Sequence, residues 1–239
     1  MHNRYTVTVL GTGICLILAC LAFTGCGRPP QPPIPEYVIR AGTVSVTLDD
    51  FLAELDLKLS AYPYDIRKSP DQYNEVVVDL LATLSEESLL LAAAAEKGIS
   101  VSEEELEAAR QEARADYPGD SFEQMLLENA VSLSLWQTKL MRSLVIRKLV
   151  QAELIEPLEI TPGDVKLFFD RQVAGGKQTG QFKGGGDETR LLRRLRLEKG
   201  QARYQEWVLS LKQVIPVHIN KQAVTNILID WQSKGTSNG

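Results

Sequence analysis

The stretch RQVAGGKQTGQFKGGGDE, residues 171–188, determines how the rest of the chain is interpreted. It is rich in glycine and polar side chains, and it is too short and too polar to fold alone around a core. Helical patterns flank it, at Val101–Asp170 and at Leu191–Asn220. We expect these two segments to be parts of one helical domain, joined by this Gly-rich bridge.

The first residues indicate export. Arg4 precedes an apolar run at 7–23, and the run closes on the sequence AFTGC at 22–26. A positive start, an apolar stretch and small residues before a cut are typical of a signal peptide. The cysteine makes residues 1–25 resemble a bacterial lipoprotein signal, and that resemblance implies lipid attachment at Cys26 followed by cleavage before it. An uncleaved membrane anchor and an ordinary signal peptide are the alternatives.

The segment that follows is expected to hold a folded domain away from a membrane. Five prolines between residues 29 and 35 favour an extended spacer, so 26–36 is predicted to be a Pro-rich tether. The lipid anchor places the protein in the cell envelope, facing the periplasm or another extracytoplasmic space. Gly27 after the cysteine is compatible with transport to the outer membrane in a Gram-negative cell. A Gram-positive cell would keep the protein on the outer face of its single membrane.

The mature chain is poor in side chains that catalyse reactions or bind metals. Once the signal is removed, Cys26 is the only cysteine and His218 the only histidine, so we expect no disulfide, thiol nucleophile or Cys/His metal site. No Asp-rich loop has the spacing of a calcium loop. A carboxylate-only metal site and a glycosidase-like carboxylate pair stay open, because 31 acidic residues cannot be sorted without geometry. We expect no cofactor.

Two further classes of partner are not expected. The formal net charge of −5 disfavours nucleic acid as a general partner. Gly175-Gly176-Lys177 resembles part of a phosphate-binding loop, but Gln178 stands where Ser or Thr is needed and the glycine spacing is wrong.

Residue patterns predict a mainly α-helical fold with a small β element. Two short strands are expected at 37–41 and 44–46 around Gly42-Thr43, and 215–219 alternates like a third. Helices are expected at about 47–60, 72–97, 102–117, 121–128, 134–154, 161–170 and 188–213. Residues 221–239 are expected to be a tail, with a weak helix through 227–229 and a disordered end.

Helix starts are marked by capping residues. Thr47 and Thr161 are expected N-caps, the latter followed by a proline at the first helical position. Capping boxes are expected at Ser102–Glu105 and at Ser121–Gln124. Asn129 is expected to end the short helix before it in the left-handed conformation.

Three stretches together resemble the SurA / PrsA / PpiD group of exported folding factors. They are Val38–Gly42 through Val46–Phe51, then Gly98–Leu106 through Phe122, Leu126, Trp136 and Lys148-Leu149 to Ile160–Val165, and finally Tyr204–Val208 followed by Val217–Asn220. Each piece alone is common in helical proteins, and their order and spacing carry the resemblance.

The resemblance implies a SurA-type helical chaperone domain, formed by 37–170 and 189–220, whose first strands pair with the strand after the last long helix. It also implies weak, sequence-tolerant binding of unfolded exported proteins, outer-membrane proteins among them. Members commonly insert a parvulin-type prolyl isomerase domain where this chain has the bridge at 171–188. Its β-rich body and paired histidines are not in the sequence, so we expect no isomerase activity and no enzyme. A swapped N-terminal strand is one route to a homodimer.

Candidate client-binding residues are Phe122, Met125, Trp136 and Met141, because helical faces bearing large apolar and Met side chains adapt to varied partners. Each could instead belong to the core. The main alternative function is a structural or assembly lipoprotein with one dedicated protein partner. An enzyme of unknown type is a third hypothesis, which the missing cysteines and histidines disfavour.

Overall fold

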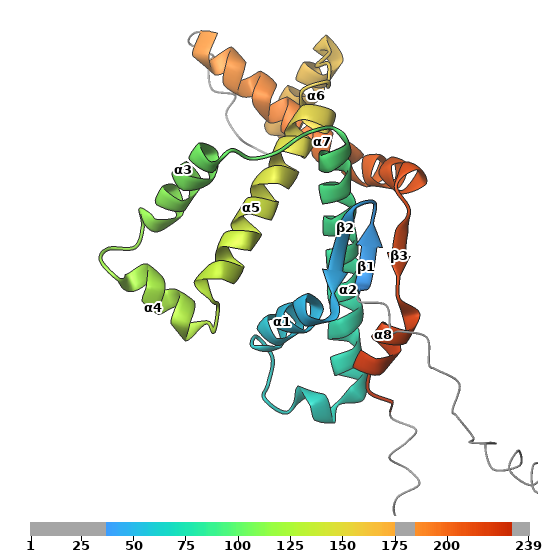
Figure 1. Cartoon of the computed structure of the whole chain (residues 1–239). Helices are drawn as coiled ribbons and strands as arrows, with labels where there is room; N and C mark the ends of the chain where they lie inside the picture. The colour runs from blue at the N-terminus through green and yellow to red at the C-terminus, as the bar shows by residue number, and fades with distance from the viewer. Residues whose placement is uncertain (1–36, 175–184, 231–239) are drawn as a thin grey trace, which may run out of the picture. The chain divides into compact units, whose positions relative to one another are not determined.

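The computed structural model describes residues 37–174 and 185–230 (Figure 1). In chain order its elements are β1 (Tyr37–Ala41), β2 (Val44–Thr47), α1 (Leu48–Leu59), the 3₁₀ turn η1 (Ile66–Lys68), α2 (Pro70–Glu96), α3 (Glu103–Arg114), α4 (Ser121–Glu128), α5 (Leu133–Val150), the π-helical turn η2 (Gln151–Ile155), α6 (Pro162–Ala174), α7 (Gly185–Val214), β3 (Val217–Ile219) and α8 (Lys221–Ile227). The predicted mainly α-helical class is confirmed. The signal, the tether with Cys26 and the middle of the bridge lie outside the described residues.

A small antiparallel sheet joins the two ends of the domain. Its strand order is β2-β1-β3, so β1 lies in the middle. Arg40 of β1 pairs with Ser45 on one side and with His218 on the other. The N–H of Asn220 extends the second pairing by donating to the carbonyl of Val38 at 2.9 Å. The expected pairing of the first strands with the strand after the last long helix is therefore confirmed.

The long helix α2 organises the domain because it contacts all three strands and helices α1, α5 and α7. Figure 1 shows the sheet lying along it. The turn between β1 and β2 lies close to α2, since a Cβ added to Gly42 would lie 3.3 Å from the Cβ of Ala92. Gly42 also has a φ of 53°, which favours glycine. A small residue on each side therefore lets the strand turn rest on the helix.

Two hydrophobic cores are built along α2. The first combines it with the sheet, α1 and α8, and its buried residues are Val38, Ile39, Val46, Phe51, Leu55, Ile66, Tyr73, Val76, Val77, Leu80, Leu84 and Ala223. The second combines it with α5, α7 and the chain before β3, and its buried residues are Ala41, Leu89, Leu90, Ala92, Ala93, Ala94, Leu149, Val208 and Ile215. Because elements pack on α2 from several sides, its buried residues extend beyond a single helical stripe.

Helices α3 and α4 pack against α5. Lys148 of α5 forms an ion pair with Glu105 of α3 at 2.8 Å. Phe122 of α4 lies between two aromatic rings, with its centroid 5.5 Å from that of Tyr117 and 4.8 Å from that of Trp136. These contacts form a small local cluster apart from the two cores.

The predicted capping residues are confirmed at three helices and wrong at one. Thr47 and Ser102 form capping boxes, and Thr161 exchanges hydrogen bonds with Asp164 in the same way. At α4 the N-cap is Asp120, because the hydroxyl of Ser121 instead donates to a carbonyl of the preceding turn at 2.7 Å.

The end of α4 also differs from the prediction. Asn129 has a φ of −92°, and its amide donates to the carbonyl of Met125 at 2.7 Å. The left-handed conformation is adopted one residue later, by Ala130 with a φ of 54°.

Residues 221–230, expected to be part of a tail, pack on the first core. The helix there is α8 at 221–227, earlier than expected, and its Ala223 is buried. Beyond it, the backbone of Ile229 is bonded to the side chain of Asn74 on α2 in both directions, at 3.0 and 2.9 Å. These contacts make the segment an integral part of the domain.

Among the helices within 37–174 and 185–230, none is both long enough and apolar enough to span a membrane.

Candidate functional site

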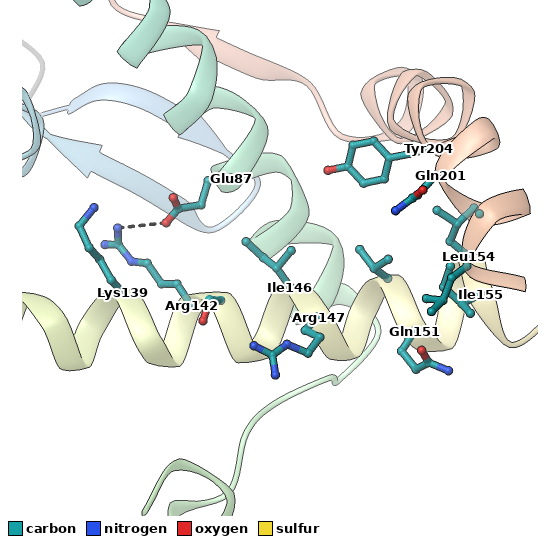
Figure 2. Close-up of a pocket in the computed structure, with 14 residues that line it drawn as sticks. Glu87, Lys139, Arg142, Ile146, Arg147, Gln151, Leu154, Ile155, Gln201 and Tyr204 are labelled. Atoms are coloured by element: carbon teal, nitrogen blue, oxygen red, sulfur yellow. Dashed lines mark hydrogen bonds and ion pairs between the residues drawn. The ribbon is translucent and has the colours of Figure 1, made fainter. Parts of the chain in front are cut away.

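A cavity of about 810 Å³ lies where α2, α5, η2 and α7 meet (Figure 2). One face of α5 forms its longest wall, because residues three and four apart on a helix lie on the same side. The lining residues are Lys139, Arg142, Ser143, Ile146, Arg147 and Val150 of α5, Gln151, Leu154 and Ile155 of η2, Leu197, Gly200, Gln201 and Tyr204 of α7, and Glu87 of α2.

The floor of the cavity is aliphatic and part of it faces solvent. Leu154 and Ile155 are nearly buried, whereas Leu197 is 45% exposed. Ile146 and Val150 are half-buried along α5. An open surface of branched aliphatic side chains gains free energy when apolar groups of a ligand cover it.

The shape of the floor depends on the π turn and on one glycine. The π turn changes the helical phase at the end of α5, and its Ile155 packs against α7 at Gly200. A Cβ on Gly200 would collide with Cδ1 of Ile155 and would lie 3.7 Å from Cδ1 of Leu158. The missing side chain of Gly200 therefore lets Ile155 pack this closely against α7, a role that the sequence pattern alone does not reveal.

Charged side chains surround the aliphatic floor. Figure 2 shows Arg142 and Glu87 facing each other from α5 and α2, with 3.3 Å between guanidinium and carboxylate. Lys139 lies 2.5 Å from the carboxylate of Glu54, which is nearly buried on α1. Arg147 is exposed and has no ion-pair partner within 37–174 and 185–230. The rim thus carries one cation whose charge the described protein does not neutralise.

Two polar contacts hold α7 in place beside the cavity. The hydroxyl of Tyr204 donates to Glu86 of α2 at 2.8 Å. Burial raises the pKa of Tyr204 above its ordinary value, and the hydrogen bond to Glu86 raises it further, so the hydroxyl stays protonated. Lys199 lies 2.8 Å from Asp164 of α6. The hydrogen bond from Lys199, and next those from Thr161, lower the pKa of Asp164 to about 2.

A second hollow, of about 520 Å³, shares three lining residues with the first: Gln151, Ile155 and Leu197. It adds Arg193 and Arg196 of α7, together with Glu156, Leu192 and Thr189. We call the two hollows together the α5–α7 groove.

The four predicted client-binding residues lie outside this groove. Phe122 is 2% exposed between its aromatic neighbours, which is the core placement that the sequence left open for it. The structure brings Phe122 and Trp136 together, while Met125 and Trp136 are half-buried. Met141 is 42% exposed on α5 and does not line the groove.

The groove was not predicted because the helix at 134–154 was expected to turn one apolar face inward, through Trp136, Leu140, Leu144, Val145 and Leu149. Of these five residues, only Leu149 is buried. Apolar side chains lie all round this helix, which is the signal that it has several contact faces. A second stripe at helical spacing, Arg142, Ile146 and Val150, marks the groove face.

No group of three or more His, Cys, Asp or Glu side chains that could hold a metal ion occurs in 37–174 or 185–230. His218 is exposed in β3, opposite Arg40. A scan against protein-family models found no match, and a search of curated proteins found no similar chain.

Proposed function

We propose that this protein is a lipid-anchored extracytoplasmic chaperone that holds unfolded or partly folded exported proteins, without prolyl isomerase activity. The observation that carries the proposal is the open aliphatic floor of the α5–α7 groove, which includes the 45% exposed Leu197. Aliphatic side chains on helices make contacts that depend little on the partner's sequence. They suit weak binding of many different apolar segments.

Two features of the chain support this proposal. The first is the ordered resemblance to the SurA / PrsA / PpiD group, which implies a sheet of N-terminal strands closed by a C-terminal strand, and β1 and β3 pair in this way. The second is the length of the segment between α6 and α7, because residues 175–184 leave no room for an isomerase domain.

The anchor is proposed from Cys26 and the prolines that follow it. A tether of this kind would hold the groove at a distance from the membrane. In that space the groove could meet exported chains before they fold. Incorporation of labelled palmitate into the full-length protein, and its loss on Cys26→Ser, would support the anchor. Equal labelling of both proteins would refute it.

The holding activity is tested by aggregation. A soluble protein that starts at residue 26 with Cys26→Ser is added to two diluting clients, an unfolded outer-membrane barrel protein and an unrelated unfolded enzyme. Light scattering reports aggregation. We expect the protein to suppress the aggregation of both clients when it is present in near-stoichiometric amounts relative to the client. No effect on either client would overturn the proposal and favour the alternative of a structural lipoprotein with one dedicated partner.

A matched pair of variants tests the groove itself. Leu197→Gln removes an exposed leucine from the groove, and Leu209→Gln removes a 58% exposed leucine from α7 that does not line it. Glutamine is a good helix former, so neither change should unfold α7. We expect Leu197→Gln to require about severalfold more protein for the same suppression, as loss of one buried leucine contact implies. Leu209→Gln should behave as wild type, and equal effects of the two changes would exclude the groove.

A further inference from the structure

We propose that the α5–α7 groove prefers extended client segments in which acidic residues flank a short apolar run. This inference rests on the proposed function and adds the chemistry of the preferred client. It is carried by the charges around the groove, which differ in sign from the charge of the protein as a whole.

The groove is locally cationic. Among the residues that line its two hollows there are five cationic side chains and two carboxylates, Glu87 and Glu156. The whole chain, in contrast, carries a formal net charge of −5. A concave surface with an excess of one sign raises the local concentration of ligands of the opposite sign.

Two of these cations are available to a ligand. Lys139 and Arg142 are paired with carboxylates of α1 and α2, and Nε of Arg196 donates to the carbonyl of Leu158 at 3.3 Å. Arg147 and Arg193 are exposed, and neither has an ion-pair partner in the described parts of the chain. Arg147 lines the first hollow and Arg193 the second. A segment lying along the groove would therefore meet one available guanidinium in each hollow.

The polar groups inside the groove favour a peptide as the occupant. Gln151 and Gln201 are exposed there, and Ser143 lies on the α5 wall. The two amides can donate to and accept from a peptide backbone, with one N–H of Gln151 already bonded to Glu156 at 3.3 Å. The hydroxyl of Ser143 donates to the carbonyl of Leu140 at 2.7 Å, so toward a peptide it can accept. An acyl chain would use none of these groups. The aliphatic floor would take the apolar side chains, while the two arginines would bind carboxylates on either side of them.

The test compares three short peptides that share a leucine- and alanine-containing centre and differ only at their flanks. One carries a glutamate on each side, one a glutamine and one a lysine. Binding to the Cys26→Ser protein starting at residue 26 is measured by fluorescence anisotropy with an uncharged dye. We expect the glutamate peptide to bind about fivefold more tightly than the glutamine peptide, as two solvent-screened ion pairs allow, and the lysine peptide to bind most weakly. The preference should fall below about twofold at about 0.5 M salt.

A double variant tests whether the two arginines cause the preference. Arg147→Gln with Arg193→Gln should bring the ratio of the glutamate and glutamine dissociation constants close to one. Arg203→Gln with Lys212→Gln removes two exposed cations of α7 that line neither hollow, and it should keep the ratio. Equal loss in both double variants would mean that net charge alone sets the preference, and it would overturn the inference.

The failures of the two proposals are distinguishable. Equal binding of all three peptides would overturn the charge preference and leave the holding function standing. Absence of binding by any peptide, with no suppression of aggregation, would refute the holding function itself. Displacement of the glutamate peptide by oleate at lower concentration than by unlabelled glutamate peptide would assign the groove to an anionic lipid and overturn the inference.

Discussion

At the scale of single residues, the contact between Gly200 and Ile155 shapes the groove. Alanine in place of glycine stabilises an ordinary helix by about 1 kcal/mol. Here the new methyl group would meet Cδ1, the movable end of the Ile155 side chain, and displacing this atom costs about 1 kcal/mol, at the low end of overpacking penalties. We therefore expect Gly200→Ala to leave the free energy of unfolding within about 0.5 kcal/mol of wild type in urea titrations, without the gain that an ordinary helix would show.

A second substitution tests whether the contact with Ile155 determines the effect of Gly200→Ala. Ile155→Val removes the Cδ1 atom that the new methyl group would meet. In the Ile155→Val background, Gly200→Ala should raise the free energy of unfolding, because the gain in helix propensity is then no longer opposed. The same change in stability in both backgrounds would show that this contact does not offset the gain in helix propensity.

Asp164 gives the attachment of α6 to α7 a pH dependence. Lys199, and next Thr161, hold its pKa at about 2, below the ordinary 3.8. The folded state has the lower pKa, so the ionised Asp164 carboxylate stabilises the fold. This stabilisation is fully present above pH 3.8 and is lost as the pH falls through about 2. Asp164→Asn should therefore lower the urea midpoint at pH 6 and have little effect near pH 2. A difference from wild type that did not change with pH would contradict this assignment.

At the scale of elements, Asn74 fastens the segment after α8 to α2. Its side chain bonds both the N–H and the carbonyl of Ile229. Asn74→Ala leaves these part-buried backbone groups without partners, so we expect it to lower the free energy of unfolding by about 1–2 kcal/mol. The control Asn226→Ala changes an exposed residue of α8 and should stay within about 0.5 kcal/mol of wild type. If Asn74→Ala and Asn226→Ala change the free energy of unfolding equally in denaturant titrations, Asn74 does not fasten this segment.

Local signals made the helices predictable. Thr47, Ser102 and Thr161 cap helices as expected because each has an acidic residue three positions later that completes the box. Ser121 lacks such a residue, since Gln124 stands there, and its hydroxyl bonds the preceding turn instead. The pairing of β1 with β3 followed from the resemblance to a known group. No local pattern specifies a contact between strands so far apart in the chain.

At the scale of the whole described molecule, the groove could not be predicted from the sequence. Its walls come from α2, α5, η2 and α7, and their relative placement depends on which faces of α5 are covered. The π turn shifts the phase of that helix, and Gly200 sets its distance from α7. Neither feature has a periodic signature. The sequence instead predicted a client-binding surface at Phe122, Met125, Trp136 and Met141, of which Phe122 is buried and none lines the groove.

The most direct measurement is photo-crosslinking of an unfolded client to the Cys26→Ser protein that starts at residue 26. A benzophenone amino acid is placed at Leu197 in the groove, at Leu209 elsewhere on α7, or at Met141 on α5 outside the groove. All three positions are exposed, so their intrinsic reactivity is comparable. If the groove holds clients, the benzophenone at position 197 will crosslink an unfolded outer-membrane barrel protein far more than the benzophenone at position 209 or 141. Capture from 141 with none from 197 would place the client on the outer face of α5 and contradict the central claim.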